Sequence, residues 1–215
     1  MRMGRITAAV LAAVAMGGAN AAFNEGFDSV SGLTAAGWVL TNNSTPVGDS
    51  WFQGNEGVFA SQSGAVGSYA AANFLSAGSE SGSISNWLIT PLLTLAAGDT
   101  LTFYTRTADP GFSDSLEVRF SSGSSSDTAS FTSLLLTVGT AANPYSTNWT
   151  QYTVALPSAA TGRIAFAYSA ANAATANYIG LDTVSVTAVP EPATMALFGL
   201  GLAAITIARR RKTAA

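Results

Sequence analysis

The chain contains neither cysteine nor histidine, and only 10% of its 215 residues are charged. Without these two residue types there is no thiolate nucleophile, no disulfide framework, no Ser-His-Asp triad and no ordinary zinc site. The charged fraction lies well below the roughly 25% of an average soluble protein, whereas Gly, Ser, Thr and Ala are abundant. These absences exclude most nucleophilic and zinc-dependent enzymes, and the remaining composition is typical of an exported protein built from β-strands.

The few charges are unevenly distributed along the chain. Of the nine basic residues, two lie within the first five positions and four lie in residues 209–212, whereas eleven of the twelve acidic residues fall in residues 23–189. The central part therefore has three arginines, no lysine and a net charge of −8. A body with this charge repels phosphates, so we expect no nucleic-acid partner.

Residues 1–22 have the features of a secretory signal peptide. Arg2 and Arg5 supply the positive start, residues 6–16 form a short apolar run, and Ala19-Asn20-Ala21 supplies small residues for cleavage. The apolar run is too short to span the roughly 30 Å hydrocarbon core of a bilayer, which argues against an uncleaved membrane anchor. We therefore predict export through the Sec translocon and a mature domain that begins near residue 23.

The other end of the chain combines a proline motif, an apolar run and a basic tip. The order is Pro190-Glu191-Pro192, then the apolar residues 195–208, then Arg209, Arg210, Arg211 and Lys212. The prolines hold their segment extended, the apolar run predicts a short membrane helix, and the basic tip would stay cytoplasmic by the positive-inside rule. A simple C-terminal anchor helix is the alternative that composition alone leaves open.

These three parts in this order resemble the PEP-CTERM sorting signal, over residues 189–215. The resemblance implies recognition and cleavage near the proline motif by an exosortase, a membrane-embedded transpeptidase-like enzyme of Gram-negative bacteria that make extracellular polysaccharide. It also implies transient anchoring in the inner membrane by the C-terminal helix, before the body reaches the cell surface or the extracellular matrix. The signal determines where the protein is sent, and it does not identify what residues 23–188 bind.

Residues 23–188 show short runs of alternating apolar and polar side chains, separated by clusters of Gly, Ser, Asn, Asp and Pro. In residues 115–120, Leu116 and Val118 would face the core while Glu117 and Arg119 face water. This spacing favours an all-β sandwich over alternating strands and helices. The expected strands are 37–42, 68–74, 83–89, 101–106, 115–120, 131–138, 151–156, 163–168 and 179–187.

The last of these runs breaks its own alternation. Ile179 and Leu181 point to one face, whereas Val184 and Val186 point to the other, so a regular strand would leave one pair outside the core. A β-bulge near Asp182 would turn both pairs inward.

An ordered set of segments runs through the body: 23–29, 37–38, 85–95, 98–106, 114–119, 149–156 and 180–186. Together they resemble the choice-of-anchor J domain, which is related to cleaved-adhesin and MAM-like jelly rolls. The resemblance implies a jelly-roll β-sandwich on an exported surface protein. Jelly rolls of this kind often hold one structural Ca²⁺ where the first and last strands meet, and Glu25 and Asp182 occupy the matching segments. Turn formation and backbone capping would explain the same carboxylates without a metal.

Aromatic side chains are the remaining candidates for a binding site, because sugar rings stack on exposed aromatic rings. Trp51 stands in a Gly- and Asn-rich stretch and is the best candidate for an exposed ring. Tyr104 points away from Phe103 and could line the outer surface of a sheet. A glycoside hydrolase needs only two carboxylates, but no pair of acidic residues stands out.

The sequence therefore predicts a non-enzymatic exported protein with a structural or adhesive role in extracellular polysaccharide or biofilm. A carbohydrate-binding module for that polysaccharide is the alternative, and a carboxylate-dependent glycoside hydrolase is a more remote one. We expect no catalytic residue, and no cofactor apart from the structural Ca²⁺ that the resemblance implies.

Overall fold

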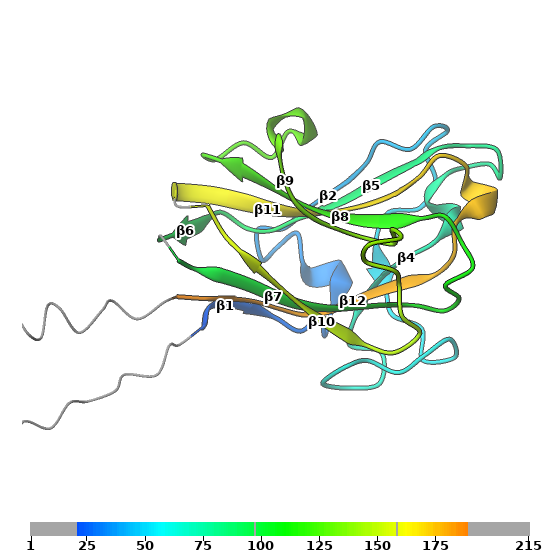
Figure 1. Ribbon diagram of the computed structural model, residues 1–215, viewed down its shortest axis with the longest axis horizontal. Coiled ribbons are helices and arrows are strands. Elements are labelled where there is room, and N and C mark those ends of the chain that lie inside the picture. Colours follow the sequence, from blue (N-terminus) through cyan, green and yellow to red (C-terminus); the bar gives the residue numbers. More distant parts are fainter. Residues whose placement is uncertain (1–20, 97, 158, 189–215) are drawn as a thin grey trace, which may run out of the picture. The chain divides into compact units, whose positions relative to one another are not determined.

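The computed structural model describes residues 21–96, 98–157 and 159–188, which form a β-sandwich of two antiparallel sheets (Figure 1). The first 20 residues of the predicted signal peptide, the Pro-Glu-Pro motif, the apolar residues 195–208 and the basic tip lie outside the described residues. Among the residues that the structure describes, no helix has the length and apolar character needed to cross a membrane.

Each sheet contains six of the described strands. Sheet A consists of β1 (Ala21–Glu25), β3 (Phe52–Gln53), β4 (Ala70–Ala72), β7 (Thr100–Thr107), β10 (Thr150–Ala155) and β12 (Ile179–Thr187). Sheet B consists of β2 (Val39–Asn42), β5 (Ile84–Ile89), β6 (Leu93–Leu95), β8 (Ser115–Ser122), β9 (Ser133–Val138) and β11 (Ala159–Ala170). The order in sheet A is β10-β7-β12-β4-β3, with β1 paired to β12; the order in sheet B is β2-β5-β11-β8-β9, with β6 paired to β11.

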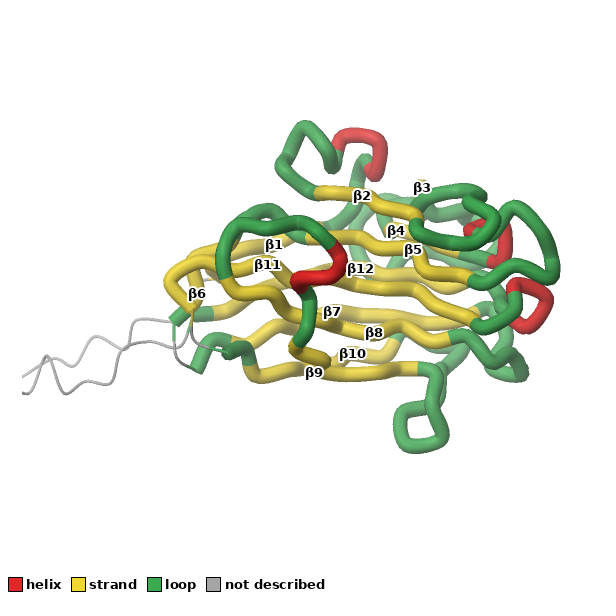
Figure 2. The backbone as a smooth tube through the Cα atoms, turned by 90° about the horizontal axis from the view of Figure 1, so that it is seen from above, coloured by secondary structure: helices red, strands yellow, loops and turns green. Residues whose placement is uncertain are grey.

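From β7 onward the chain passes repeatedly from one sheet to the other. β7 belongs to sheet A, β8 and β9 to sheet B, β10 to sheet A, β11 to sheet B and β12 to sheet A. The strands of both sheets run in roughly the same direction (Figure 2), as in aligned β-sandwiches. This crossing pattern confirms the all-β jelly-roll sandwich that the sequence predicts.

Every strand that the alternation predicts is present, with boundaries that shift by a few residues. The predicted strand 68–74 shortens to β4, and the predicted strand 163–168 lengthens to β11 at both ends. The alternation does not predict β1, β3 or β6, because these strands have five, two and three residues and are too short to show a period.

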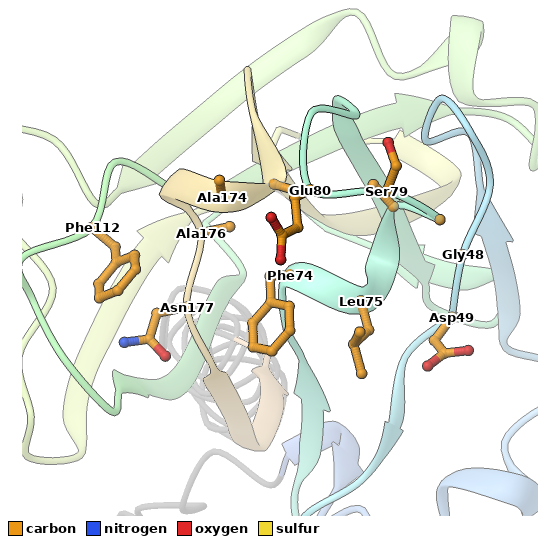
Figure 3. A pocket seen from close by; sticks show the side chains of 13 residues that line it. Gly48, Asp49, Phe74, Leu75, Ser79, Glu80, Phe112, Ala174, Ala176 and Asn177 are labelled. Atoms are coloured by element: carbon orange, nitrogen blue, oxygen red, sulfur yellow. The ribbon is translucent and has the colours of Figure 1, made fainter.

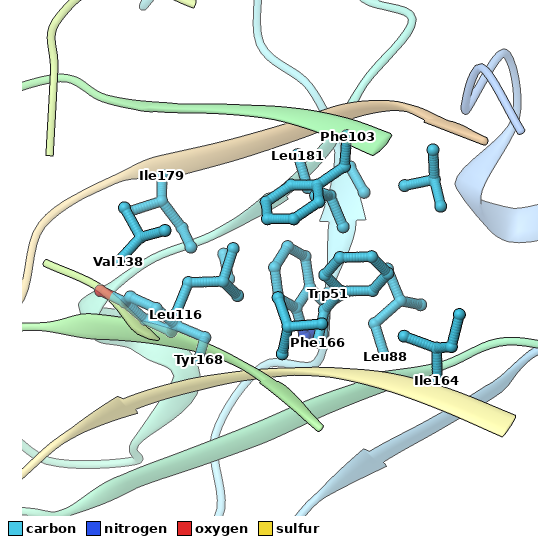
Figure 4. Packing of buried hydrophobic residues seen from close by; sticks show 14 of the residues in the cluster. Trp51, Leu88, Phe103, Leu116, Val138, Ile164, Phe166, Tyr168, Ile179 and Leu181 are labelled. Atoms are coloured by element: carbon cyan, nitrogen blue, oxygen red, sulfur yellow. The ribbon is translucent and has the colours of Figure 1, made fainter. Parts of the chain in front are cut away.

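The hydrophobic core lies between the sheets and is formed by alternate side chains of the long strands. Figure 4 shows Phe103 and Leu181 of sheet A facing Phe166 and Leu88 of sheet B. The rings of Phe103 and Phe166 meet edge to face, with centroids 5.3 Å apart, a favourable aromatic geometry. On the outer face of sheet B, Glu117 and Arg119 form an ion pair at 2.6 Å, in the orientation that the alternation predicts.

The predicted bulge in β12 is present. The pairing of β12 with β7 changes register between Asp182 and Ser185, and Thr183 adopts a positive φ of 48°. As a result all four apolar side chains of the strand reach the core, with exposed fractions of 1% or less: Ile179, Leu181, Val184 and Val186. A single irregularity therefore resolves the conflict in the alternation of this segment.

The two ends of the sandwich differ in what they carry. Ala21 of β1 pairs with Thr187 of β12, so both the first and the last described strand reach one end. The start of β12 lies about 26 Å away, at about 3.3 Å per residue, at the opposite end beside η2 and η4 (Figure 1). The described 3₁₀ helices are η1 (Val30–Gly32), η2 (Phe74–Ser76), η3 (Thr128–Ser130) and η4 (Ala173–Thr175).

Candidate functional site

A groove of about 690 Å³ opens at the end of the sandwich that carries η2 and η4 (Figure 3). Three apolar side chains line it and remain exposed: Phe74 at 46%, Leu75 at 49% and Phe112 at 39%. The exposed carboxylates of Asp49 and Glu80 line it as well, and none of its lining residues is basic. Grouped exposed apolar side chains mark contact surfaces, so this groove is the candidate binding site.

One wall of the groove is formed where the loop before β3 meets η2. The side-chain amide of Asn42 donates to the backbone carbonyls of Gly48, Asp49 and Ser76, at 3.2, 2.9 and 2.8 Å. The amide of Asp49 donates to the carbonyl of Leu75 at 2.7 Å. A Cβ atom on Gly48 would lie 2.2 Å from that same carbonyl oxygen, so the close approach of the two segments requires glycine.

The other wall is formed by η4 and the segment before β5. The side chain of Asn172 caps η4 by accepting from the amide of Ala174 at 2.9 Å. Two backbone hydrogen bonds join η4 to the neighbouring segment, from Ala173 to the carbonyl of Gly82 at 2.7 Å and from Ala174 to the carbonyl of Glu80 at 2.8 Å. These bonds fix the backbone of Glu80 at the groove.

A buried carboxylate anchors the floor of the groove to the core. Asp114, 1% exposed, accepts from the Tyr168 hydroxyl at 2.6 Å and from the amide of Asn177 at 3.0 Å. Burial and the nearby charge of Asp114 raise the pKa of Tyr168, so its hydroxyl remains a donor. Asn177 lines the groove, and its side-chain nitrogen makes no hydrogen bond to any described residue.

This arrangement is suited to holding a ligand that has both an apolar face and hydroxyl groups. In Figure 3, Phe112 lies on one side of the groove and Asp49 on the other, with Phe74 and Leu75 between them. Aromatic and apolar side chains can cover a flat ligand face, while carboxylate oxygens accept from hydroxyls and an amide nitrogen donates to them.

The structure does not place the two sequence-predicted carbohydrate residues in this groove. The prediction that Trp51 is exposed is wrong: Trp51 is 3% exposed, lies in the core between the sheets (Figure 4), and donates from Nε1 to the carbonyl of Asn86 at 3.1 Å. The Gly- and Asn-rich segment around Trp51 is a loop whose backbone directs the indole ring into the core. Tyr104 does point outward from sheet A, half-buried, opposite Gln151 of β10.

The sequence interpretation missed the apolar residues of the groove, although a signal was present. Phe112 follows Asp109-Pro110-Gly111, a turn sequence with no alternating partners. Phe74 and Leu75 stand directly before a Ser- and Gly-rich stretch. A large apolar side chain in a turn has no strand face on which to be buried, so it either turns into the core, as Trp51 does, or becomes a candidate contact residue.

Glu25 pairs with Val184 at the end of the β1–β12 ladder, and Asp182 lies two residues before Val184. Both carboxylates accept hydrogen bonds from backbone amides. Asp182 is fully buried and accepts from the amides of Gln62, Ser63 and Thr183 at 2.7, 3.2 and 2.6 Å. Glu25 accepts from the amide of Phe27 at 2.7 Å. Burial raises the pKa of Asp182, although these amide donors oppose the effect.

These donors satisfy the Asp182 carboxylate without a metal, and calcium binding by Glu25 and Asp182 stays a prediction. Calcium takes six to eight oxygen ligands, whereas N–H donors already occupy both carboxylate oxygens of Asp182. Among the described residues, no group of three or more acidic side chains could hold a metal ion. Asp182 instead ties the loop at residues 62–63 to the bulge of β12.

We expect a chelator to leave the thermal unfolding midpoint of the full chain unchanged, because amides and not a cation satisfy Asp182. The substitution Asp182→Asn should lower the free energy of unfolding by about 1–3 kcal/mol, because it sets an NH₂ group against amide donors. Differential scanning fluorimetry with and without EDTA measures both effects. Asp109→Asn, at an exposed turn, is the matched control. A midpoint that falls with EDTA and recovers with Ca²⁺ would restore Glu25 and Asp182 as ligands.

Comparison with known proteins agrees with the fold and with the tail. Residues 188–212 match the PEP-CTERM protein-sorting motif. The K1 cleaved adhesin domain of Lys-gingipain from Porphyromonas gingivalis W83 is similar in structure, with a TM-score of 0.59 and 24% identity over 78% of this chain and 98% of that domain. The K3 domain of the same protein gives 0.57 and 25%, over 79% and 99%. No curated protein matches the chain.

These findings confirm the sorting signal and the adhesin-like β-sandwich. The chain is an exported, cell-surface protein that carries an exosortase sorting motif, and its body has the fold of the cleaved adhesin domains. At this level of identity the likeness concerns the fold, so the ligand has to be argued from the groove itself.

Proposed function

We propose that this protein is a non-catalytic adhesive component of the extracellular polysaccharide or biofilm, and that it holds a neutral polysaccharide in the groove. The observation that carries the proposal is the position of the groove. Asn177 lines it and is followed by Tyr178 and then β12, whose far end meets the sorting motif at residue 188. A body attached through its C-terminal end therefore presents the groove away from the attachment.

The charge of the body supports a neutral polymer as the ligand. The groove is lined by Asp49 and Glu80 without a basic residue, and the body as a whole has a net charge of −8. An acidic polysaccharide would be repelled by the two carboxylates that line the groove. A neutral sugar can place one ring face on Phe74 or Phe112 and donate its hydroxyls to the two carboxylates.

The exposure of the two carboxylates favours binding over hydrolysis. A glycoside hydrolase needs a general acid that stays protonated near neutral pH, and a hydrophobic or like-charged environment is what achieves this. Asp49 and Glu80 are both exposed to solvent, so the groove does not give them the contrasting environments that an acid and a base require.

The tail completes this proposal. Before processing, the apolar residues 195–208 would anchor the chain in the inner membrane, with the basic tip on the cytoplasmic side. Cleavage by the exosortase near the proline motif would then pass the body to the surface or the matrix, where the groove engages polysaccharide.

We expect the double variant Phe74→Ala, Phe112→Ala to bind neutral polysaccharide roughly tenfold or more weakly than the parent protein, because each lost stacking contact is worth about 1 kcal/mol. Affinity electrophoresis of the full chain in gels that contain the cell's own polysaccharide, dextran or a galactan measures the retardation. Leu134→Ala removes an equally exposed apolar side chain from β9, where Leu134 is 50% exposed, and should leave binding unchanged.

The same variants separate the adhesive proposal from a purely structural one. Cells that produce the double variant should retain less polysaccharide at their surface than cells with Leu134→Ala, at equal protein abundance. Equal retardation of all three proteins in every gel would contradict the groove as the binding site.

A further inference from the structure

The described residues contain three arginines, and among them Arg106 alone makes no hydrogen bond or ion pair. Arg119 pairs with Glu117 at 2.6 Å, and Arg163 donates to the carbonyls of Thr90 and Ser124 at 2.7 and 3.2 Å. The Nε atom of Arg106 is buried and has no acceptor. A buried N–H group without an acceptor is unfavourable, so contacts other than hydrogen bonds must hold the Arg106 side chain in this position.

Aromatic rings hold the side chain of Arg106 in place on the outer face of sheet A. Its guanidinium carbon lies 4.2 Å from the centroid of the Phe59 ring and 5.9 Å from that of Trp149, within the range of cation–π attraction. Gly180 pairs with Arg106 in the sheet, and a Cβ atom there would lie 2.7 Å from the Trp149 ring. We call the surrounding rings the aromatic cage: Phe59, Tyr69, Trp149 and Tyr178.

The charge of Arg106 has no counterion in this cage. Burial lowers its pKa, and among the residues that the structure describes the Tyr69 hydroxyl is the ionisable group that acts on it. The two terminal nitrogens make no hydrogen bond and, unlike Nε, retain contact with solvent. The rings therefore hold the guanidinium while its terminal nitrogens stay available as donors to a ligand.

A strip of uncharged polar side chains extends from the cage along the outer face of β7 and β10. Tyr104 and Thr102 alternate outward with Arg106 on β7, and their partners in the pairing with β10 are Gln151 and Thr153. Hydroxyl and amide groups of this kind suit a polyhydroxylated chain better than an apolar peptide.

We infer that Arg106 and this strip form a second binding site, which takes the carboxylate of a uronic acid residue within an acidic polysaccharide. The two terminal nitrogens of Arg106 each donate to one oxygen of the carboxylate, so that two parallel hydrogen bonds join the planar guanidinium and carboxylate groups. The sugar ring lies against the exposed part of Trp149, and hydroxyls of the chain reach Tyr104 and Gln151. Elsewhere the acidic body repels such a polymer, so the uncharged strip with its single cation selects the docking position.

Isothermal titration of the full chain with trigalacturonate, monitored in parallel by tryptophan fluorescence, tests this inference. We expect binding in the parent protein that weakens as salt is added. Arg106→Met should weaken it roughly tenfold or more, and Arg106→Lys should weaken it less, because lysine keeps the charge and loses the planar pair of donors. Thermal melting of both variants verifies folding, and Arg106→Lys supports the inference even if Arg106→Met is unstable.

Two controls distinguish this site from the groove and from other ligands. Arg119→Gln removes an arginine that already has a partner and should bind trigalacturonate like the parent protein. The groove variant Phe74→Ala, Phe112→Ala should also bind it unchanged, so the two proposals fail independently. The inference is wrong if the parent protein shows no heat or fluorescence change at millimolar trigalacturonate, if Arg106→Lys and Arg106→Met bind as the parent does, or if pentaglutamate binds more tightly than trigalacturonate.

Discussion

Replacement of Trp51 by alanine is expected to lower the free energy of unfolding by about 3–5 kcal/mol, the range for deleting a large buried aromatic side chain. Trp51 is 3% exposed and packs within the core that both sheets share (Figure 4). Its removal leaves a cavity and leaves the carbonyl of Asn86 without the Nε1–H donor at 3.1 Å. Urea denaturation followed by fluorescence measures the shift in midpoint at constant slope.

The matched control is Phe112→Ala in the groove. Phe112 is 39% exposed, so this change should alter stability by about 0.5 kcal/mol or less. The pair of variants thus separates a ring that stabilises the fold from a ring that is available to a ligand. Equal urea midpoints for Trp51→Ala and Phe112→Ala would show that Trp51 is not part of the buried core.

Replacement of Pro190, Glu191 and Pro192 by three alanines is expected to abolish processing of the tail. The sequence predicts that the two prolines keep this segment out of a helix, and three alanines remove both that restraint and the charged residue between them. The protein should then accumulate with its C-terminus at Ala215 and be lost from the culture medium and the cell surface. Mass spectrometry of the membrane fraction identifies the retained terminus.

A control for this variant is Pro110→Ala, which changes one proline in the loop between β7 and β8. It should leave processing intact. Since the described body ends before the proline motif, the triple variant should retain the groove and its polysaccharide binding when purified in detergent. Normal release of the triple variant would show that the exosortase recognises another part of the tail.

The strands that could be predicted are those in which one face is buried and the other is solvated. In β7 and β8 every second side chain enters the core, so the period of two appears directly in the sequence. The bulge in β12 could be predicted for the same reason. Leu181 and Val184 would face opposite sides of a regular strand, and one extra residue between them turns both side chains into the core. β3 has two residues, and a period cannot be read from so few.

The groove could not be predicted because its parts are far apart in the chain. Asp49, Phe74, Phe112 and Asn177 lie in four separate connections, and none of these connections has a repeating pattern. They meet because the crossing order of the strands brings their ends together at one side of the sandwich. The burial of Trp51 could not be predicted for a related reason. Its loop position predicts an exposed ring, but the loop directs the ring into the core between the two sheets.

Local order along the chain was sufficient to indicate the sorting motif, the β-class and the bulge, because each depends on residues that are neighbours in sequence. The tertiary structure alone decided which aromatic rings are buried, that Asp182 is satisfied by amides, and that Arg106 stands in an aromatic cage without a counterion. Those outcomes depend on the order in which strands pair, and pairing joins residues whose separation in sequence carries no information about their contact.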